Sequence, residues 1–300
     1  MGPGGRRGFA AGLAGRRRAG PGLTGSRRIL ILAPHPDDEI VACGIAARRA
    51  RAEGARVFVL YLTTGIPPRG LLWPWQRRSY GARIARRRDE ALAAAGCFGL
   101  EPAGFCDISS RRLVAHLDEA ASTLDRTLAG TSADCLWVPA FEGAHQDHDA
   151  ANALAARFRD RLPVWEFAAY NCAGGKARSN RFADARGGVI ELRLSRDEAA
   201  LKRRGLALYA SERGNLAHIR TAEEASRPLP RHDYGAPPHA GKLFRERFHW
   251  VPFRHPRIDF MPSAEIYAAL GRWCTAAAGA QRPGVAPAAD GWPPGSRKRS

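Results

Sequence analysis

Short apolar runs alternate with helix-length stretches along the first half of the chain, and this alternation constrains the fold most. We expect strands at RRILILA (27–33), ARVFVLYLTTG (55–65), AGFCDIS (103–109) and DCLWVPA (134–140). Helical patterns lie between these runs, at about 38–53, 80–96 and 111–129. Parallel strands need long crossover connections, which are usually helices. The alternation therefore predicts an α/β fold with a doubly wound, mostly parallel sheet.

Regularity fades beyond about Asn171. Two more strand candidates, VWEFAAY and VIELRLS, and one helical pattern, SRDEAALKRRGLALYAS, precede a stretch at 212–262 that is rich in Pro, His and aromatic residues. We expect a single domain over 27–280, with an irregular cap or extension at 213–280. The Gly-, Pro- and Arg-rich tails at 1–26 and 281–300 have too few large apolar side chains to offset the ordering entropy, so we expect them to be disordered.

The net charge of +18 does not by itself indicate a nucleic-acid-binding protein. More than half of this excess lies on the first 28 and last 20 residues, and only four of the 47 basic residues are lysines. A solvated basic surface explains the charge, and attraction to a phosphate or an acidic substrate is the alternative. No RNP, zinc-finger or basic-zipper pattern is present, so we expect no specific nucleic-acid partner.

Neither a membrane span nor a secretory signal is expected. No apolar run approaches the ~18 residues of a transmembrane helix, and the Arg-rich N-terminus lacks a continuous apolar h-region. The six cysteines include no C-x-x-C pair and have mostly apolar neighbours. We therefore expect reduced cysteines and a cytoplasmic protein.

Two clusters of ionisable residues follow predicted strands. The stretch APHPDDEIVACG (33–44) places a histidine between two prolines and three carboxylates after them, directly behind the apolar run ILILA. The sequence HQDH (145–148) follows the strand DCLWVPA. In a doubly wound sheet of order 3-2-1-4 these two strands are neighbours, and ligands bind outside their carboxyl ends. We therefore expect both clusters to face one crevice, although they are far apart in sequence.

Two histidines and one carboxylate with an open position are the ligands of a catalytic zinc site. His35, Asp38 and His148 are the expected ligands. Zinc lowers the pKa of bound water towards ~7. Asp37 is then available to accept the proton of that water.

The remaining members of the clusters receive supporting roles. His145 is expected to protonate or polarise the oxyanion, and Asp147 to hold the ring of His145 and keep it charged. Glu39 is expected to support the ligands without binding the metal. Other interpretations stay open: acidic residues at a helix start are often a solvated cap, HQDH alone is compatible with a surface loop, and an iron(II) facial triad uses the same ligand types.

APHPDDE and HQDH resemble the two signatures of the LmbE-like, or PIG-L, family of zinc-dependent N-deacetylases. The resemblance spans about 28–212. It implies a Rossmann-like α/β fold, and it agrees with the roles given above to His35, Asp37, Asp38, His145 and His148. The chain has Gln146 where the family usually has proline, which removes no ligand.

Weaker family features suggest substrate contacts. LTTG (62–65), the R-x-x-E of Arg87 and Glu90, and ALYASE (207–212) are similar to family segments. Arg87 either contacts substrate or forms a surface ion pair with Glu90, three residues away on a predicted helix. Trp73 and Trp75 lie on a Pro-rich loop, where they either stack on a sugar or cover the edge of the core.

The sequence therefore predicts a zinc-dependent hydrolase that removes an N-acetyl or other small acyl group from an amino sugar such as N-acetylglucosamine, or from a related amine. Fe²⁺, Mn²⁺ and Co²⁺ are alternative metals. The competing hypothesis is a catalytically silent α/β protein that binds an anionic partner. The sequence gives no basis for predicting an oligomeric state.

Overall fold

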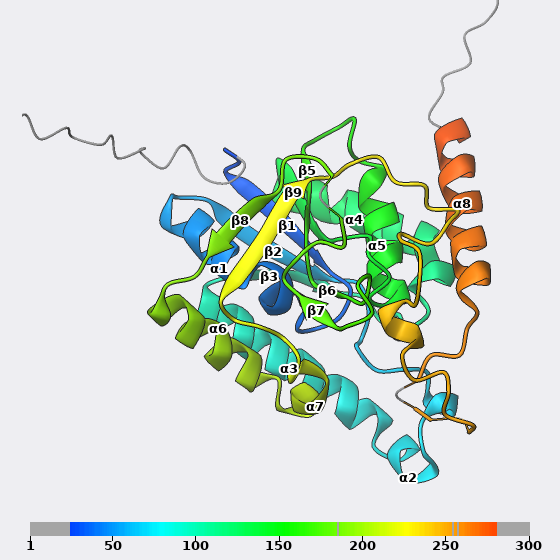
Figure 1. The fold of residues 1–300 in the computed structure, drawn as a ribbon. Helices are drawn as coiled ribbons and strands as arrows, with labels where there is room; N and C mark the ends of the chain where they lie inside the picture. Colours follow the sequence, from blue (N-terminus) through cyan, green and yellow to red (C-terminus); the bar gives the residue numbers. More distant parts are fainter. Residues whose placement is uncertain (1–24, 185, 254, 257, 281–300) are drawn as a thin grey trace, which may run out of the picture.

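A computed structural model describes residues 25–280 apart from 185, 254 and 257, and it contains a seven-stranded sheet (Figure 1). The sheet order is β3-β2-β1-β4-β5-β9-β8. From edge to edge the strands are β3 (Glu101–Phe105), β2 (Arg56–Tyr61), β1 (Arg28–Ala33), β4 (Cys135–Pro139), β5 (Val164–Phe167), β9 (Glu223–Pro228) and β8 (Ile190–Arg193). The first five pair in parallel, whereas β9 is antiparallel to both of its neighbours. The predicted α/β class and the order 3-2-1-4 are thus confirmed.

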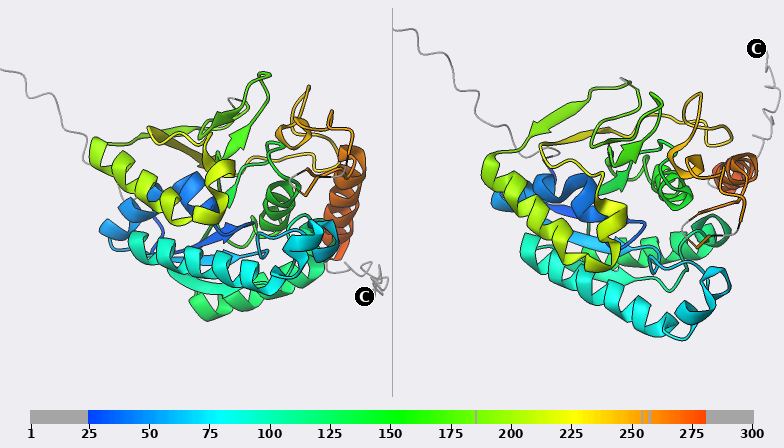
Figure 2. Two further views of the ribbon diagram at one scale, coloured as in Figure 1. Left: turned by 90° about the horizontal axis from the view of Figure 1, so that it is seen from below. Right: turned by 60° about the horizontal axis from the view of Figure 1, so that its bottom comes forward.

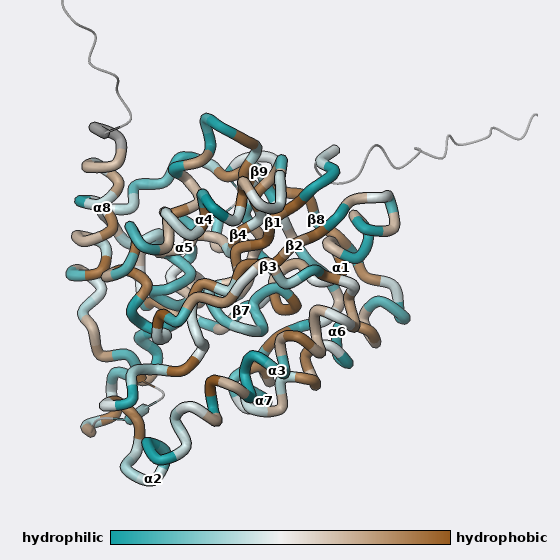
Figure 3. Tube along the Cα trace, turned by 180° about the vertical axis from the view of Figure 1, so that it is seen from behind, coloured by the Kyte–Doolittle hydropathy of each residue, from teal (hydrophilic) through white to brown (hydrophobic). Residues whose placement is uncertain are grey.

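Helices cover both faces of the sheet (Figures 1 and 2). The long helices are α1 (Asp38–Ala52), α3 (Tyr80–Phe98), α4 (Leu117–Thr131), α5 (Gln146–Ala156), α6 (Arg196–Leu208) and α8 (Ser263–Ala280). One hydrophobic core joins the sheet to α1, α3 and α6, and another joins it to α4, α5 and α8. Figure 3 shows the resulting concentration of apolar residues in the central strands.

Strand β1 supplies both cores because side chains alternate between the faces of a strand. Ile29 and Ile31 pack on the α1 side, whereas Leu30 and Leu32 pack on the α4 side. All four are at most 2% exposed. A strand that is buried on both faces must be apolar throughout, which explains why ILIL could be recognised directly from the sequence.

A buried carboxylate from the sheet supports a break inside α1. Cys43 leaves helical geometry at φ −147°, ψ 21°. Glu224, on β9, accepts hydrogen bonds from the backbone N–H groups of Ile45 (3.0 Å) and Ala46 (2.8 Å), and it pairs with the buried Lys202 of α6 at 2.8 Å. Glu224 therefore caps the second half of α1 from another part of the chain, as an N-cap side chain would do locally.

The prediction of an irregular segment at 213–280 is only partly correct. This segment contains β9, which lies inside the sheet, and α8, whose Ile266, Tyr267 and Leu270 are buried. Strand β9 has the polar sequence EEASRP. Its polar side chains are buried through ion pairs with distant residues, which no local pattern reveals. The expected disordered tails lie outside the described residues, apart from Gly25 and Ser26.

Short elements complete the structure. They are α2 (Pro74–Arg77), α7 (Arg213–Leu216) and a two-stranded ribbon of β6 (Tyr170–Asn171) and β7 (Arg178–Ser179). The six cysteines all belong to the described residues and form no disulfide. Within 25–280, none of the helices combines the length and apolar character of a membrane span.

Candidate metal centre

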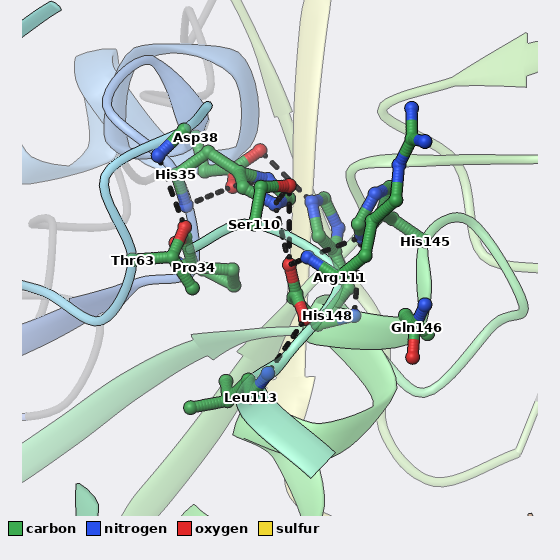
Figure 4. Close-up of polar contacts among 12 residues, drawn as sticks. Pro34, His35, Asp38, Thr63, Ser110, Arg111, Leu113, His145, Gln146 and His148 are labelled. Atoms are coloured by element: carbon green, nitrogen blue, oxygen red, sulfur yellow. Dashed lines mark hydrogen bonds and ion pairs between the residues drawn. The ribbon is translucent and has the colours of Figure 1, made fainter. Parts of the chain in front are cut away.

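The turn between β1 and α1 holds the first cluster in a fixed shape. Thr63, just beyond β2, donates its hydroxyl to the carbonyl oxygen of Pro34 at 2.8 Å. The backbone N–H of His35 donates to Asp38 Oδ2 at 2.8 Å. Prolines 34 and 36 restrict the backbone on both sides of His35. The side chains of His35 and Asp38 therefore lie together beyond the carboxyl end of β1 (Figure 4).

The three predicted ligands meet, although His148 comes from α5. One atom each of His35, Asp38 and His148 lies within 4.8 Å of the other two. His35 Nδ1 is 3.1 Å from Asp38 Oδ2, and His148 Nε2 is 3.1 Å from Asp38 Oδ1. The contact between His148 Nε2 and Asp38 Oδ1 does not have the geometry of a hydrogen bond. Both ring nitrogens of the fully buried His148 are without a hydrogen-bond partner. A buried imidazole nitrogen that points at a carboxylate without bonding to it fits a metal ligand.

The charges around this point favour a cation. Burial alone would lower the pKa of His35, but its hydrogen bonds to Asp147 and Asp38 outweigh this effect and raise the pKa to about 10. Burial would likewise raise the pKa of Asp38, but nearby His148 and the hydrogen-bonded His35 hold it well below its usual range. Two buried carboxylates, Asp38 and Asp147, thus flank His35, and such a concentration of acidic groups suits a divalent metal ion.

The carboxylate of Asp147 hydrogen-bonds to His35 rather than to His145, in contrast to the prediction. His35 Nε2 is 3.0 Å from Asp147 Oδ2, whereas His145 Nδ1 is 3.6 Å from it and makes no hydrogen bond with it. The loop after β3 adds donors to the same carboxylate: the backbone N–H groups of Arg111 (2.6 Å) and Leu113 (3.2 Å) and the hydroxyl of Ser110 (3.3 Å). Nothing in the sequence indicated this loop. A carboxylate that holds the outer nitrogen of a histidine ligand orients that ligand.

The structure favours a neutral ring for His145, whereas the sequence analysis predicts a charged one. Burial, aided by the charge of His35, lowers its pKa well below the usual value. The backbone N–H of Asp147 donates to His145 Nδ1 at 3.1 Å, at the N-terminus of α5. The neutral ring therefore carries its proton on Nε2. Because His145 lines the cavity described below, it is suited to donate a hydrogen bond rather than a proton.

Asp37 adopts a strained conformation at the start of α1. Its φ of 136° lies in a region that non-glycine residues rarely adopt. Its side chain accepts a hydrogen bond from Arg87 Nη2 at 3.0 Å, and its backbone N–H donates to Glu39 Oε2 at 3.1 Å. Burial raises the pKa of Asp37 to about 7, although Arg87 opposes this shift. A carboxyl group with this pKa is suited to act as a base near neutral pH.

Arg87 lies beneath this turn and is not part of a surface ion pair. Its side chain is 2% exposed and also donates to the carbonyl oxygen of Pro36. Glu90 is 4.0 Å away and Glu212 is 3.7 Å away. A Cβ added to Gly65 would approach Arg87 Nε to 2.9 Å. Gly65, in the LTTG segment, therefore leaves space for the side chain of Arg87. Arg87 belongs to the R-x-x-E segment and contacts Asp37, so both segments lie near Asp37.

Glu39 lies behind the cluster, beside the turn that carries His35 and Asp38. It is fully buried, and the hydroxyl of Tyr209 donates to it. Burial raises the pKa of Glu39 to about 8, and the Tyr209 hydrogen bond opposes this shift. Tyr209 belongs to the ALYASE segment, so this hydrogen bond connects the end of α6 to the start of α1. Glu39 thus supports the backbone N–H of Asp37 without lying in the group of three candidate ligands.

A cavity of about 270 Å³ opens over this site. Its lining includes His35, Asp37, Asp38 and His145 and several residues of 244–259. Trp73 and Trp75 are absent from the lining, although Leu72 and Gln76 beside them contribute to it. The two indole rings stack on each other at 5.3 Å, and Trp75 is 69% exposed. The structure therefore places both tryptophans beside the cavity rather than in it.

The fold and the site together define a doubly wound α/β protein with a His-Asp-His cluster suited to a divalent metal. Residues 30–158 match the family model described as PIG-L, GlcNAc-PI de-N-acetylase. This range includes both motifs, APHPDDE and HQDH, and the three candidate metal ligands. A search of curated protein sequences found no match.

Solved structures of deacetylases share this fold. The zinc-inhibited form of the teicoplanin deacetylase Orf2 is 16% identical, with a TM-score of 0.51, over 67% of this chain and 97% of that chain. The A40926 pseudoaglycone deacetylase Dbv21 is 18% identical, with a TM-score of 0.52, over 67% of this chain and 96% of that chain. At such identities the similarity shows a common fold only.

Proposed function

We propose that this protein is a metal-dependent hydrolase that removes an N-acetyl or other small N-acyl group from an amino sugar or a related amine. One observation carries the proposal: the unpartnered nitrogens of buried His148 lie beside His35 and Asp38, and these two residues line a cavity together with Asp37. The PIG-L match supports the reaction class. Two proteins of similar fold, described as deacetylases of glycopeptide antibiotics, agree with it.

His35, Asp38 and His148 would hold the metal, for which we propose zinc, with Fe²⁺, Mn²⁺ or Co²⁺ as alternatives. A divalent cation held there would acidify a water molecule and polarise the amide carbonyl. The contact between Asp147 and His35 Nε2 supports a role in which Asp147 keeps the ring of His35 oriented, with Nδ1 on the side of Asp38.

Asp37 would accept a proton from the attacking water while the water oxygen bonds to the amide carbon. The neutral His145 would donate a hydrogen bond from Nε2 to the carbonyl oxygen as negative charge develops there. Asp37 would then pass its proton to the amine nitrogen as the C–N bond breaks, which releases the carboxylic acid and the free amine. The position of Arg87 supports a role in holding Asp37 in its strained conformation.

Two substitutions distinguish the proposed hydrolase from the competing hypothesis of a catalytically silent binding protein. Asp38→Ala should lose metal affinity. Asp37→Asn should keep the metal and lose turnover by about 10²- to 10⁴-fold, as expected for a general base. Metal content is measured by elemental analysis, and turnover by the free amine released from a panel of N-acetyl sugars, lipid-linked sugars and acylated amines.

Two results would contradict the proposal. One is a purified protein that takes up less than about a tenth of an equivalent of any of the four metals after supplementation, since the ligand set predicts one tightly held ion. The other is an Asp37→Asn variant that loses its metal while Asp38→Ala keeps it, because the two roles would then be reversed.

A further inference from the structure

The cavity over the candidate metal ligands also has a buried guanidinium group with unused donors in its lining. Arg245 lies on the short helical turn Phe244–Glu246, and its side chain is 1% exposed. Nη2 donates to the carbonyl oxygen of Met261, whereas Nε and Nη1 have no hydrogen-bond partner. Asp259 is 3.9 Å from Nη1, too far for a hydrogen bond, and it accepts one from Gln146. Buried donors without partners are costly, so a functional reason is expected.

Arg247 lines the same cavity two residues further on. Its guanidinium group lies over the rings of Phe244 (3.6 Å) and Phe248 (4.6 Å), and Nη1 donates to the carbonyl oxygen of Phe244 at 3.2 Å. Among residues 25–280 as described, no carboxylate forms an ion pair with Arg247. The side chains of Arg245 and Arg247 thus line one cavity, and both retain donors for a ligand.

Ring contacts connect Arg247 to the candidate metal ligands. The guanidinium group of Arg247 lies over Phe244, the ring of Phe244 is 4.6 Å from that of Tyr170, and Tyr170 is 5.3 Å from the ring of His148. Tyr170 and Phe244 therefore lie in the cavity lining between Arg247 and the candidate metal cluster. A substrate of sugar size that fills this cavity could contact the metal ligands and the two arginines at once.

Other charged groups line the same cavity. They include the carboxylates of Asp37, Asp38, Glu212 and Asp259. Arg87 is engaged with Asp37, and Arg111 donates to the carbonyl oxygens of Pro256 and Ile258. Arg245 and Arg247, in contrast, retain donors for a ligand.

We propose that Arg245 and Arg247 bind an oxyanion, either a carboxylate or a phosphate, that the substrate carries beyond its N-acyl group. The orientation of the substrate rests on the proposed function: its neutral amide lies at the metal ligands and its anion at the arginines. Guanidinium groups bind both oxyanions through paired N–H donors. The favoured substrate is therefore an N-acylated amino sugar that bears an acidic substituent.

Binding to the metal-loaded Asp37→Asn variant tests this subsite without turnover. Isothermal titration calorimetry would compare N-acetylglucosamine, N-acetylglucosamine 1-phosphate and N-acetylmuramic acid, which carries a carboxylate. We expect at least one acidic ligand to bind about tenfold or more tightly than the neutral sugar, because hydrogen bonds to charged groups are the strong ones. The two acidic ligands distinguish phosphate from carboxylate recognition.

Substitutions of Arg245 and Arg247 test whether these two residues cause the preference for acidic ligands. In the Asp37→Asn background, Arg247→Gln should abolish most of the preference, and Arg247→Lys should keep part of it. Arg245→Gln should act in the same direction, and its thermal midpoint checks that the buried site still folds. Arg126→Gln is the matched control, since Arg126 is exposed on α4 and does not line the cavity. It should leave the preference unchanged.

Equal affinities for all three ligands would overturn the subsite, even if deacetylation of neutral sugars were found. An acidic preference that survives Arg247→Gln and a folded Arg245→Gln would also overturn it. An acidic preference that is lost in these variants would support the subsite, even if no ligand were ever deacetylated. In that case the proposed hydrolase activity would be wrong and the anion site would stand.

Discussion

Replacing Arg87 with Gln should move the activity of this protein to higher pH. Arg87 Nη2 donates to Asp37 Oδ2 at 3.0 Å, and the two side chains are only 2% and 10% exposed. Burial raises the pKa of Asp37 to about 7, and the charge of Arg87 limits this rise. Gln keeps an N–H donor at this position but removes the charge. Asp37 should therefore titrate at a higher pH in the variant.

The size of the shift follows from the distance. An opposite charge within ~4–6 Å lowers the pKa of a carboxyl group by about 1–3 units, so its removal should raise the Asp37 pKa by a similar amount. The base works only when ionised, and a higher pKa leaves a smaller ionised fraction at neutral pH. We therefore expect kcat/KM at pH 7 to fall by about 10- to 1000-fold and to recover as the pH rises.

The assay is the pH profile of kcat/KM between about pH 5 and pH 10. Arg88→Gln is the matched control, because Arg88 is half-exposed on the same helix and pairs only loosely with Asp107, at 3.7 Å. Metal content and thermal midpoint should be measured for both variants. If Arg87→Gln kept both but its acidic limb coincided with that of the unmodified protein, Arg87 would not act on Asp37 as reasoned here.

Three further predictions concern the metal, the sheet and the tails. Asp147→Asn should weaken metal binding by about 10- to 100-fold in a competition titration, because the contact to His35 Nε2 is altered; unchanged affinity would contradict that role. Glu224→Ala should lower the free energy of unfolding by about 3–5 kcal/mol in urea, since Lys202 would remain buried without its partner; a loss below about 1 kcal/mol would show that the pair contributes little. A chain shortened to residues 27–280 should fold, bind one metal and retain kcat/KM, whereas a tenfold loss at an unchanged thermal midpoint would assign a tail to the active site.

The sequence by itself determined the parallel half of the sheet and the three side chains of the candidate metal cluster. Strands β1, β2 and β4 are buried on both faces, so local composition is sufficient to recognise them. Each cluster directly follows one of these strands. The order of parallel strands then brings both clusters to one edge, and this conclusion needs no knowledge of side-chain contacts.

Only the tertiary structure decided which polar side chains are buried and what they contact. Arg87 looked like one member of a helical surface pair, yet it lies under the active-site turn, where Gly65 leaves it room. Asp147 stands two residues from His145 but bonds to His35, because the loop after β3 directs its donors to that carboxylate. Strand β9 looked like loop because the partners that satisfy its charges lie far away in the sequence. A charged residue has the same local pattern whether its partner is water or a distant side chain, so its burial is fixed only when the chain has folded.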